Sequence, residues 1–238
     1  MSKNKISRKD FLSTSALLGV STLVGTSALT SCGEKGPVYT PIKEAGTYYV
    51  PELPDKAIDG KELKAGVIGC GGRGSGAIFD LLNAANGIKV VALGDTFADR
   101  LNGLKGRLAK SNQVVADDKC FVGFDAYKKV IDSGVDMVVI ATPPAFRPIH
   151  FQYATEKGVH SFLEKPIAVD AKGYRTIMAA AKQAKAKGLS VVTGTQRHHQ
   201  RAYVEAFKKI QEGWIGEITG GNVYWNQSML WYRERQKE

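Results

Sequence analysis

The hydrophobic pattern from residue 61 onward alternates short apolar runs with amphipathic stretches. The apolar runs are continuous, which is typical of strands that are buried on both faces in a parallel sheet. The predicted strands are 63–69, 88–93, 120–122, 135–141, 159–163 and 189–193. Apolar residues at helical spacing predict one helix between the first two strands and others at 97–110, 126–131, 147–157 and 174–187. This order predicts an α/β fold with a doubly wound parallel sheet.

The chain continues beyond the last of these strands with one more predicted helix, which begins at Arg201. Its apolar face carries Tyr203, Ala206, Phe207 and Ile210. Residues 216–227 are then predicted to form a strand. The pattern therefore predicts that a second domain begins after the sheet.

The N-terminus has the pattern of a targeting segment. Residues 1–10 are basic, and residues 11–29 contain no charged side chain but seven Ser or Thr, which favours an export signal over a permanent membrane span. The segment ends in the sequence LTSC at Cys32, which resembles the lipobox of bacterial lipoproteins. The resemblance implies that residues 1–31 are removed, that Cys32 is lipidated, and that the protein is exported, to the periplasm or as a membrane-anchored lipoprotein. The alternative is a plain secretory signal with an incidental cysteine.

Residues 32–60 hold four of the eight prolines and show no apolar periodicity. This composition predicts a semi-extended linker behind the lipid-anchor cysteine. The stretch from Ser7 to Leu12 also resembles the twin-arginine export motif, but Lys9 stands where the second arginine belongs. The export route, twin-arginine or general secretory, therefore stays open.

The net charge of +10 over 238 residues first suggests a nucleic-acid partner. The positive charges are spread along the chain, however, and many lie on the predicted solvent faces of helices, as do Lys182, Lys185, Lys187, Lys208 and Lys209. We therefore expect solvated helix faces and no nucleic-acid partner. The three cysteines are too few for a disulfide scaffold and have no zinc-binding spacing, so we expect no metal site.

A glycine-rich turn lies between the first predicted strand and the first predicted helix. It has the G-x-G-x-x-G pattern at Gly69, Gly71 and Gly74, with Gly72 and Arg73 completing the loop. In dinucleotide-binding folds the first glycine permits the tight turn, the second lets a pyrophosphate approach the backbone, and the third lets helix and strand pack closely. The helix start then presents free N–H groups to the anion. The alternative is an ordinary turn, but the strand and helix on either side favour a phosphate-binding loop.

An acidic residue stands where a dinucleotide-binding domain needs one. Asp95 lies 21 residues after Gly74 and directly follows the second apolar run. Its carboxylate can accept hydrogen bonds from the ribose hydroxyls and would repel a 2′-phosphate, so NAD is favoured over NADP. Arg73 is the counterargument, because an arginine in the loop could hold that phosphate. Cys70 is expected to be a small packed residue and not a redox thiol.

Three further segments, ATPP at 141–144, His150 and EKP at 164–166, complete a recognisable set. Together with the glycine loop they resemble the glucose–fructose oxidoreductase, inositol dehydrogenase and rhizopine-catabolism family (Gfo/Idh/MocA), over residues 62–227. The resemblance implies a Rossmann domain that binds NAD(P) and a second domain that holds a sugar or polyol. It also implies that Lys165 lies beside the nicotinamide and the reacting hydroxyl and acts as the catalytic residue, whereas by itself it could be a surface lysine.

The same resemblance implies cofactor-binding roles for residues at the ends of other strands. Thr142 and Pro143 match a segment that passes along the cofactor, and Glu164 belongs to the EKP motif. His150 matches a position near the cofactor pocket, although it could equally be packed between helix and sheet. Gln196 follows the sixth strand, where a family side chain approaches the nicotinamide carboxamide.

These features predict residues 61–196 as the Rossmann domain and 197–238 as the start of an α+β substrate domain. The family's G-x-H-x-x-D stretch does not occur, so we expect a truncated chain that is inactive on its own. The expected function is oxidation of a sugar, polyol or derivative, with a homo-oligomer of the full-length protein left open. Some relatives are exported glycosidases that oxidise the sugar at C3, eliminate the aglycone, add water and reduce again. That activity and a cofactor-binding fragment without catalysis remain as alternatives.

Overall fold

A computed structural model describes Pro41, Val50 and residues 60–228. Its centre is a six-stranded parallel sheet with the strand order β3-β2-β1-β4-β5-β6. The strands are β1 (Leu63–Ile68), β2 (Ile88–Asp95), β3 (Cys120–Val122), β4 (Met137–Ile140), β5 (His160–Leu163) and β6 (Val191–Thr193). The predicted doubly wound parallel sheet is confirmed.

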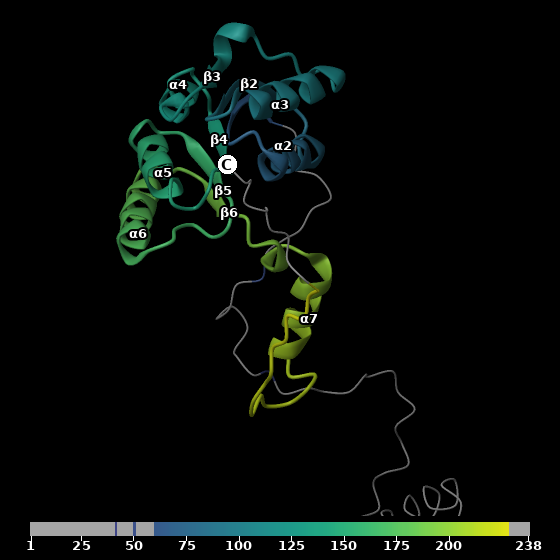
Figure 1. The fold of residues 1–238 in the computed structure, drawn as a ribbon. Helices are drawn as coiled ribbons and strands as arrows, with labels where there is room; N and C mark the ends of the chain where they lie inside the picture. Colours follow the sequence, from purple (N-terminus) through teal and green to yellow (C-terminus); the bar gives the residue numbers. More distant parts are fainter. Residues whose placement is uncertain (1–40, 42–49, 51–59, 229–238) are drawn as a thin grey trace, which may run out of the picture. The chain divides into compact units, whose positions relative to one another are not determined.

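Helices cover both faces of this sheet. These helices are α2 (Gly72–Ala84), α3 (Ala98–Lys110), α4 (Ala126–Ile131), α5 (Arg147–Glu156) and α6 (Ala171–Ala186), and a further helix, α7 (Arg201–Gln211), follows β6. Two short 3₁₀ turns are η1 (Asp117–Lys119) and η2 (Gln196–His198). Figure 1 shows α2 and α3 on one side of the strands and α4, α5 and α6 on the other.

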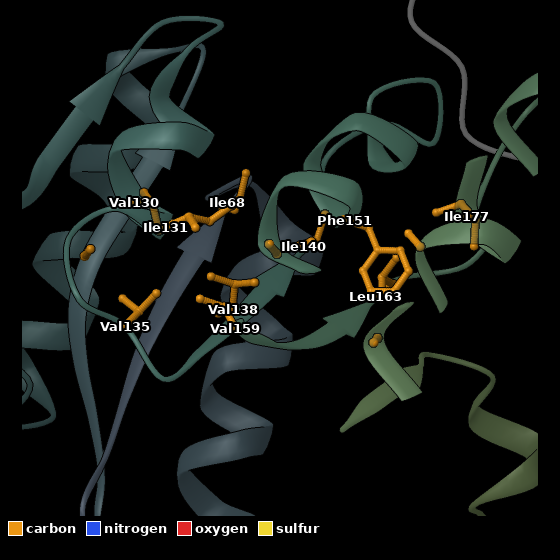
Figure 2. Close-up of a cluster of buried hydrophobic side chains, with 14 residues drawn as sticks. Ile68, Val130, Ile131, Val135, Val138, Ile140, Phe151, Val159, Leu163 and Ile177 are labelled. Carbon is orange, nitrogen blue, oxygen red and sulfur yellow. The ribbon is translucent and has the colours of Figure 1, made fainter. Parts of the chain in front are cut away.

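The alternation of side chains along the strands divides the core into two clusters. Val67 packs with Ile78 and Leu104 under α2 and α3, whereas its neighbour Ile68 points into the opposite cluster. Figure 2 shows this second cluster, in which Phe151 of α5 and Ile177 of α6 lie near strand residues such as Leu163. Because both faces are buried, the central strands are mainly apolar, as the sequence indicated, and Lys64 and Lys89 lie near the strand starts.

The strand order places a topological switch point between β1 and β4. The chain leaves β1 toward β2 on one side of the sheet and leaves β4 toward β5 on the other. Parallel strands end at the same edge, so the connections that follow β1 and β4 diverge and leave a crevice there, where such sheets bind ligands. The glycine loop and the Thr142 segment are these two connections.

Three predictions about the second half of the chain need correction. Helix α6 begins at Ala171 and not at 174, because the Asp170 side chain accepts a hydrogen bond from Gly173 N at 2.6 Å and caps the helix. Residues 216–227 form no strand in the described structure, since no ladder includes them and a strand needs a partner. Helix α7 begins at Arg201 as predicted, but Tyr203 and Phe207 of the predicted apolar face are exposed, whereas Val204 is buried.

Of the described residues, 60–208 belong to one compact unit and 209–228 to another. The predicted solvent exposure of the helix lysines is confirmed at Lys182, Lys185, Lys187, Lys208 and Lys209. The export signal at 1–31 and Cys32 lie outside the described residues, as does nearly all of the linker. No helix among the described residues is long and apolar enough to cross a membrane.

Candidate functional site

Two glycines of the loop are required by the protein's own packing. Gly69 has φ +93°, and a Cβ there would lie 2.8 Å from the backbone nitrogen of Thr142. A Cβ on Gly74 would lie 1.8 Å from the carbonyl oxygen of Gly69, so the first turn of α2 packs directly on the end of β1. These positions therefore bring the loop, the helix and the Thr142 segment together at the switch point.

The packing of the protein does not require glycine at Gly71 or Gly72. A Cβ on either would meet nothing within 4 Å among the described residues, and Gly71 has an ordinary φ of −66°. Helix α2 begins here without a side-chain cap and without an acidic residue in its first turn. Open space beside uncapped N–H groups fits the pyrophosphate of a dinucleotide, which needs close approach to the backbone.

Asp95 at the end of β2 is fixed against this loop. Its Oδ2 accepts a hydrogen bond from Cys70 N at 2.6 Å, and its Oδ1 accepts one from Phe97 N at 2.9 Å. Cys70 is buried, its burial raises the pKa of the thiol, and it packs in the core as expected. The carboxylate is therefore held beside the glycine loop, at the strand end where a ribose would lie.

We expect Asp95→Ala to weaken NADH binding by roughly ten- to a hundred-fold, because hydrogen bonds to a charged group are worth about 1.5–3 kcal/mol. NADPH should weaken less, because the variant also removes a charge that repels the 2′-phosphate. The measurement is a fluorescence titration of both cofactors. Asp99→Ala, which removes an exposed acid on α3, is the control and should change neither affinity. Equal weakening of both cofactors would show that Asp95 only orders the loop.

Arg73 connects the glycine loop to the EKP segment. Its Nε lies 2.7 Å from Oε1 of Glu164, and its Nη1 lies 3.8 Å from Asp80. Glu164 is only 3% exposed, and its carboxylate packs against Gly194, where a Cβ would lie 2.7 Å from Oε1. The Arg73 guanidinium, considered above as a phosphate ligand, is therefore engaged by a buried carboxylate.

Lys165 follows the end of β5 and is exposed. Its backbone nitrogen donates to Oε2 of Glu164 at 3.3 Å. Arg147, the first residue of α5, donates from Nη1 to the carbonyl oxygen of Glu164 at 2.5 Å and to that of Pro166. The Lys165–Pro166 peptide bond is cis. The lysine side chain is thus presented at the carboxyl edge of the sheet from a segment held by neighbouring side chains.

His150 lies under the Thr142 segment. Its Nδ1 is 3.2 Å from Oγ1 of Thr142, and its ring stacks on Tyr127 at a centroid distance of 4.2 Å. The side chain is 5% exposed, and burial lowers the pKa of His150 to about 4, so the imidazole is neutral at pH 7. His150 is therefore packed between helix and sheet. It does not line the crevice itself but contacts Thr142, which does. Pro143 is exposed at the same edge.

Because His150 is buried in its neutral form, folding should lose stability as the pH falls. The unfolded chain takes up the proton near pH 6.5 and the folded chain only near pH 4, so stability is complete above 6.5 and decreases between these values. We expect His150 to contribute a loss of about 2 kcal/mol between pH 7 and pH 5. Urea unfolding at both pH values measures it. His150→Phe should lack this loss, and an unchanged pH dependence in that variant would contradict the assignment.

The remaining predicted site residue, Gln196, lies exposed in η2 beyond β6. The sequence analysis did not identify Arg147. The feature that could have indicated it is a cationic residue at the start of a predicted helix. It also missed exposed aromatic residues at the same edge, Phe97 after β2 and Phe124 after β3. Within the part of the chain that the structure describes, no three His, Cys, Asp or Glu side chains are grouped as metal ligands would be.

Comparison with known proteins places this arrangement in a family. Residues 63–208, which include every strand of the sheet, match the GFO_IDH_MocA family, described as an oxidoreductase family with an NAD-binding Rossmann fold. The chain belongs to this family. The glycine loop, Asp95 and the EKP segment therefore lie in an NAD-binding Rossmann domain.

Relatives of this Gfo/Idh/MocA protein include the scyllo-inositol 2-dehydrogenase (NAD(+)) of Bacillus subtilis, 28% identical over 66% of this chain and 42% of its own length. The crystal structure of myo-inositol 2-dehydrogenase from Lactobacillus plantarum is 28% identical, with a TM-score of 0.54 over 66% of this chain and 43% of that one. A glycosyl hydrolase family 109 protein of Solibacter usitatus is 26% identical over 95% of this chain and 47% of its own length. The chain thus spans less than half the length of these relatives.

Proposed function

We propose that this protein is an NAD-dependent dehydrogenase that oxidises a hydroxyl group of a sugar or polyol. The observation that carries the proposal is the Arg73–Glu164 ion pair of 2.7 Å, which joins the phosphate-binding loop to the segment that presents Lys165. Cofactor loop and candidate catalytic lysine are thereby held at one edge of the sheet. The similarity to inositol dehydrogenases supports a polyol or a sugar ring as the substrate.

The residues at this edge divide the work between binding and proton transfer. NAD, when bound, supplies the hydride acceptor. Gly71 and the first turn of α2 would bind the pyrophosphate, and Asp95 would bind the ribose. Lys165, exposed beyond β5, would accept or share the proton of the reacting hydroxyl through Nζ and stabilise the developing alkoxide.

A second candidate is cleavage of a glycoside without net oxidation. The match to the glycosyl hydrolase family 109 protein extends over 236 residues, whereas that to the Bacillus subtilis dehydrogenase covers 156. The longer match includes sequence on both sides of the Rossmann domain, which favours this candidate. The Rossmann residues described above would serve either activity.

One experiment separates the two activities. The full chain as the cell produces it is incubated with NAD⁺ and either a panel of inositols and sugars or a panel of aryl glycosides. A dehydrogenase accumulates NADH in proportion to oxidised substrate. A glycosidase releases the aglycone from the glycoside with no net NADH. Absence of both products, with NADH binding intact, would contradict both proposals.

We also propose that the protein is exported and anchored through lipid on Cys32. The support is the LTSC sequence after a basic and then uncharged N-terminus. A single acyl chain binds membranes only reversibly, with a constant of about 10⁴ M⁻¹, so stable anchoring needs more than one chain. Membrane fractionation of the parent and of Cys32→Ser tests this. Equal distribution of the two proteins would overturn the lipid anchor.

A further inference from the structure

The Lys165 segment is held mainly by side chains and not by the sheet. Strand β5 ends at Leu163, and the last strand-like hydrogen bond runs from Glu164 N to Ile140 O at 3.0 Å. Beyond it, the described contacts of this backbone are the Lys165 N–Glu164 Oε2 bond and the two bonds donated by Arg147. The two carbonyl groups that Arg147 binds belong to Glu164 and Pro166, the residues on either side of Lys165. One guanidinium nitrogen therefore holds the backbone before and after the residue that presents this lysine.

The position of Arg147 is unfavourable for the fold by ordinary rules. It is the first residue of α5, where the helix dipole is positive and a cation is disfavoured. It is 5% exposed, burial lowers the pKa of its guanidinium, and its Nε has no hydrogen-bond partner among the described residues. A buried cation with an unpartnered donor reduces stability. The described contacts that Arg147 makes with its side chain are the two bonds to the backbone around Lys165, which points to a role there and not to a contribution to folding.

We propose that Arg147 is a positioning residue that sets the direction of the Lys165 side chain. The inference rests on the proposed role of Lys165 in proton transfer. It adds that the orientation of the Lys165 side chain requires the hydrogen bonds from Arg147. Arg147 binds the carbonyl groups of the two residues that flank Lys165, Glu164 and Pro166, and no contact with the reacting atoms is required of it. Loss of these bonds should leave the phosphate loop intact and misplace the lysine.

The chain supplies a matched control at the other end of the same helix. Lys187 donates through Nζ to the carbonyl oxygens of Thr155 at 2.8 Å and Glu156 at 2.9 Å. Lys187→Met thus removes a cation that binds two backbone carbonyl groups, as Arg147→Met does, but these lie at the end of α5 and away from Lys165. Arg147→Lys keeps the charge on a shorter side chain and is the partial-rescue variant.

The test uses three readouts on the full-length protein as the cell produces it. The first is the NADH dissociation constant. The second is the ¹H–¹³C NMR signal of reductively dimethylated Lys165, assigned as the signal that Lys165→Met lacks. The third, measured on unmodified protein, is the single-turnover hydride-transfer rate at saturating cofactor. Thermal unfolding of each variant confirms that it is folded.

We expect Arg147→Met to bind NADH within about three-fold of the parent, to shift or broaden the Lys165 signal, and to slow hydride transfer by roughly ten- to a hundred-fold. Arg147→Lys should be intermediate and Lys187→Met like the parent. An unchanged Lys165 signal and rate in folded Arg147→Met would overturn the proposal. If that variant does not fold, parent-like values in Arg147→Lys overturn it. A parent without hydride transfer contradicts the proposed function instead, and the Lys165 signal still tests the positioning.

Discussion

Lys165→Met should lower the rate of hydride transfer by roughly 10²–10⁴ while NADH binding stays within a few-fold of the parent, the usual effect of removing a general acid–base group. The reason is the placement of Lys165 beyond β5, outside the glycine loop and the Asp95 carboxylate that would bind the cofactor. Methionine keeps most of the aliphatic stem and removes only the ammonium group. Since Lys165 is exposed, the substitution should leave the free energy of unfolding nearly unchanged.

The measurement is single-turnover transfer in the full-length protein, as the cell produces it, at matched cofactor saturation. Lys172→Met, at another exposed lysine, in the first turn of α6, is the control and should keep the parent rate. A Lys165→Met protein that keeps its transfer rate but loses NADH affinity would make Lys165 a cofactor-binding residue. Retention of both would leave it as a surface lysine.

The sheet could be predicted from the sequence because burial on both faces makes parallel strands continuously apolar, as in the run 135–141. The structure shortened that strand to Met137–Ile140 but kept its place beside β1. The prediction of a strand at 216–227 was wrong for a physical reason. Apolar residues indicate a buried strand only where a partner strand exists. Val223, predicted inside a strand, is 98% exposed.

The sequence could predict those site residues whose identity is required by the local backbone conformation. Gly69 and Gly74 follow from turn geometry and close packing, both of which the strand–loop–helix context encodes. The Arg73–Glu164 pair and the bonds from Arg147 were not predictable, because they join residues separated by 91, 17 and 19 positions along the chain. Only the fold brings those groups together. His150 shows the same limit, as its burial beside Tyr127 depends on how α4 and α5 pack.

The glycine loop provides the second large effect. Gly74→Ala should destabilise the domain by about 3 kcal/mol or more, because the new Cβ would lie 1.8 Å from the Gly69 carbonyl oxygen and helix α2 would have to move off the sheet. That corresponds to a fall in melting temperature of roughly 10 °C. Thermal unfolding followed by circular dichroism measures it. A melting temperature within about 2 °C of the parent would mean that α2 does not pack on β1 as described.

Gly71→Ala should leave stability nearly unchanged and weaken cofactor binding, and it is therefore the sharper test of the phosphate-binding role of the glycine loop. Its Cβ meets nothing within 4 Å among the described residues, and its φ of −66° suits alanine, so stability should change by less than about 1 kcal/mol. If a pyrophosphate occupies that space, the methyl group separates it from the N–H groups of α2, and NADH affinity should fall by roughly ten- to a hundred-fold. Gly103→Ala, on α3 with equally open surroundings, is the control and should bind NADH like the parent. Parent-like NADH binding by a folded Gly71→Ala protein would place the pyrophosphate elsewhere, because no anion can approach those amides closely with a methyl group between them.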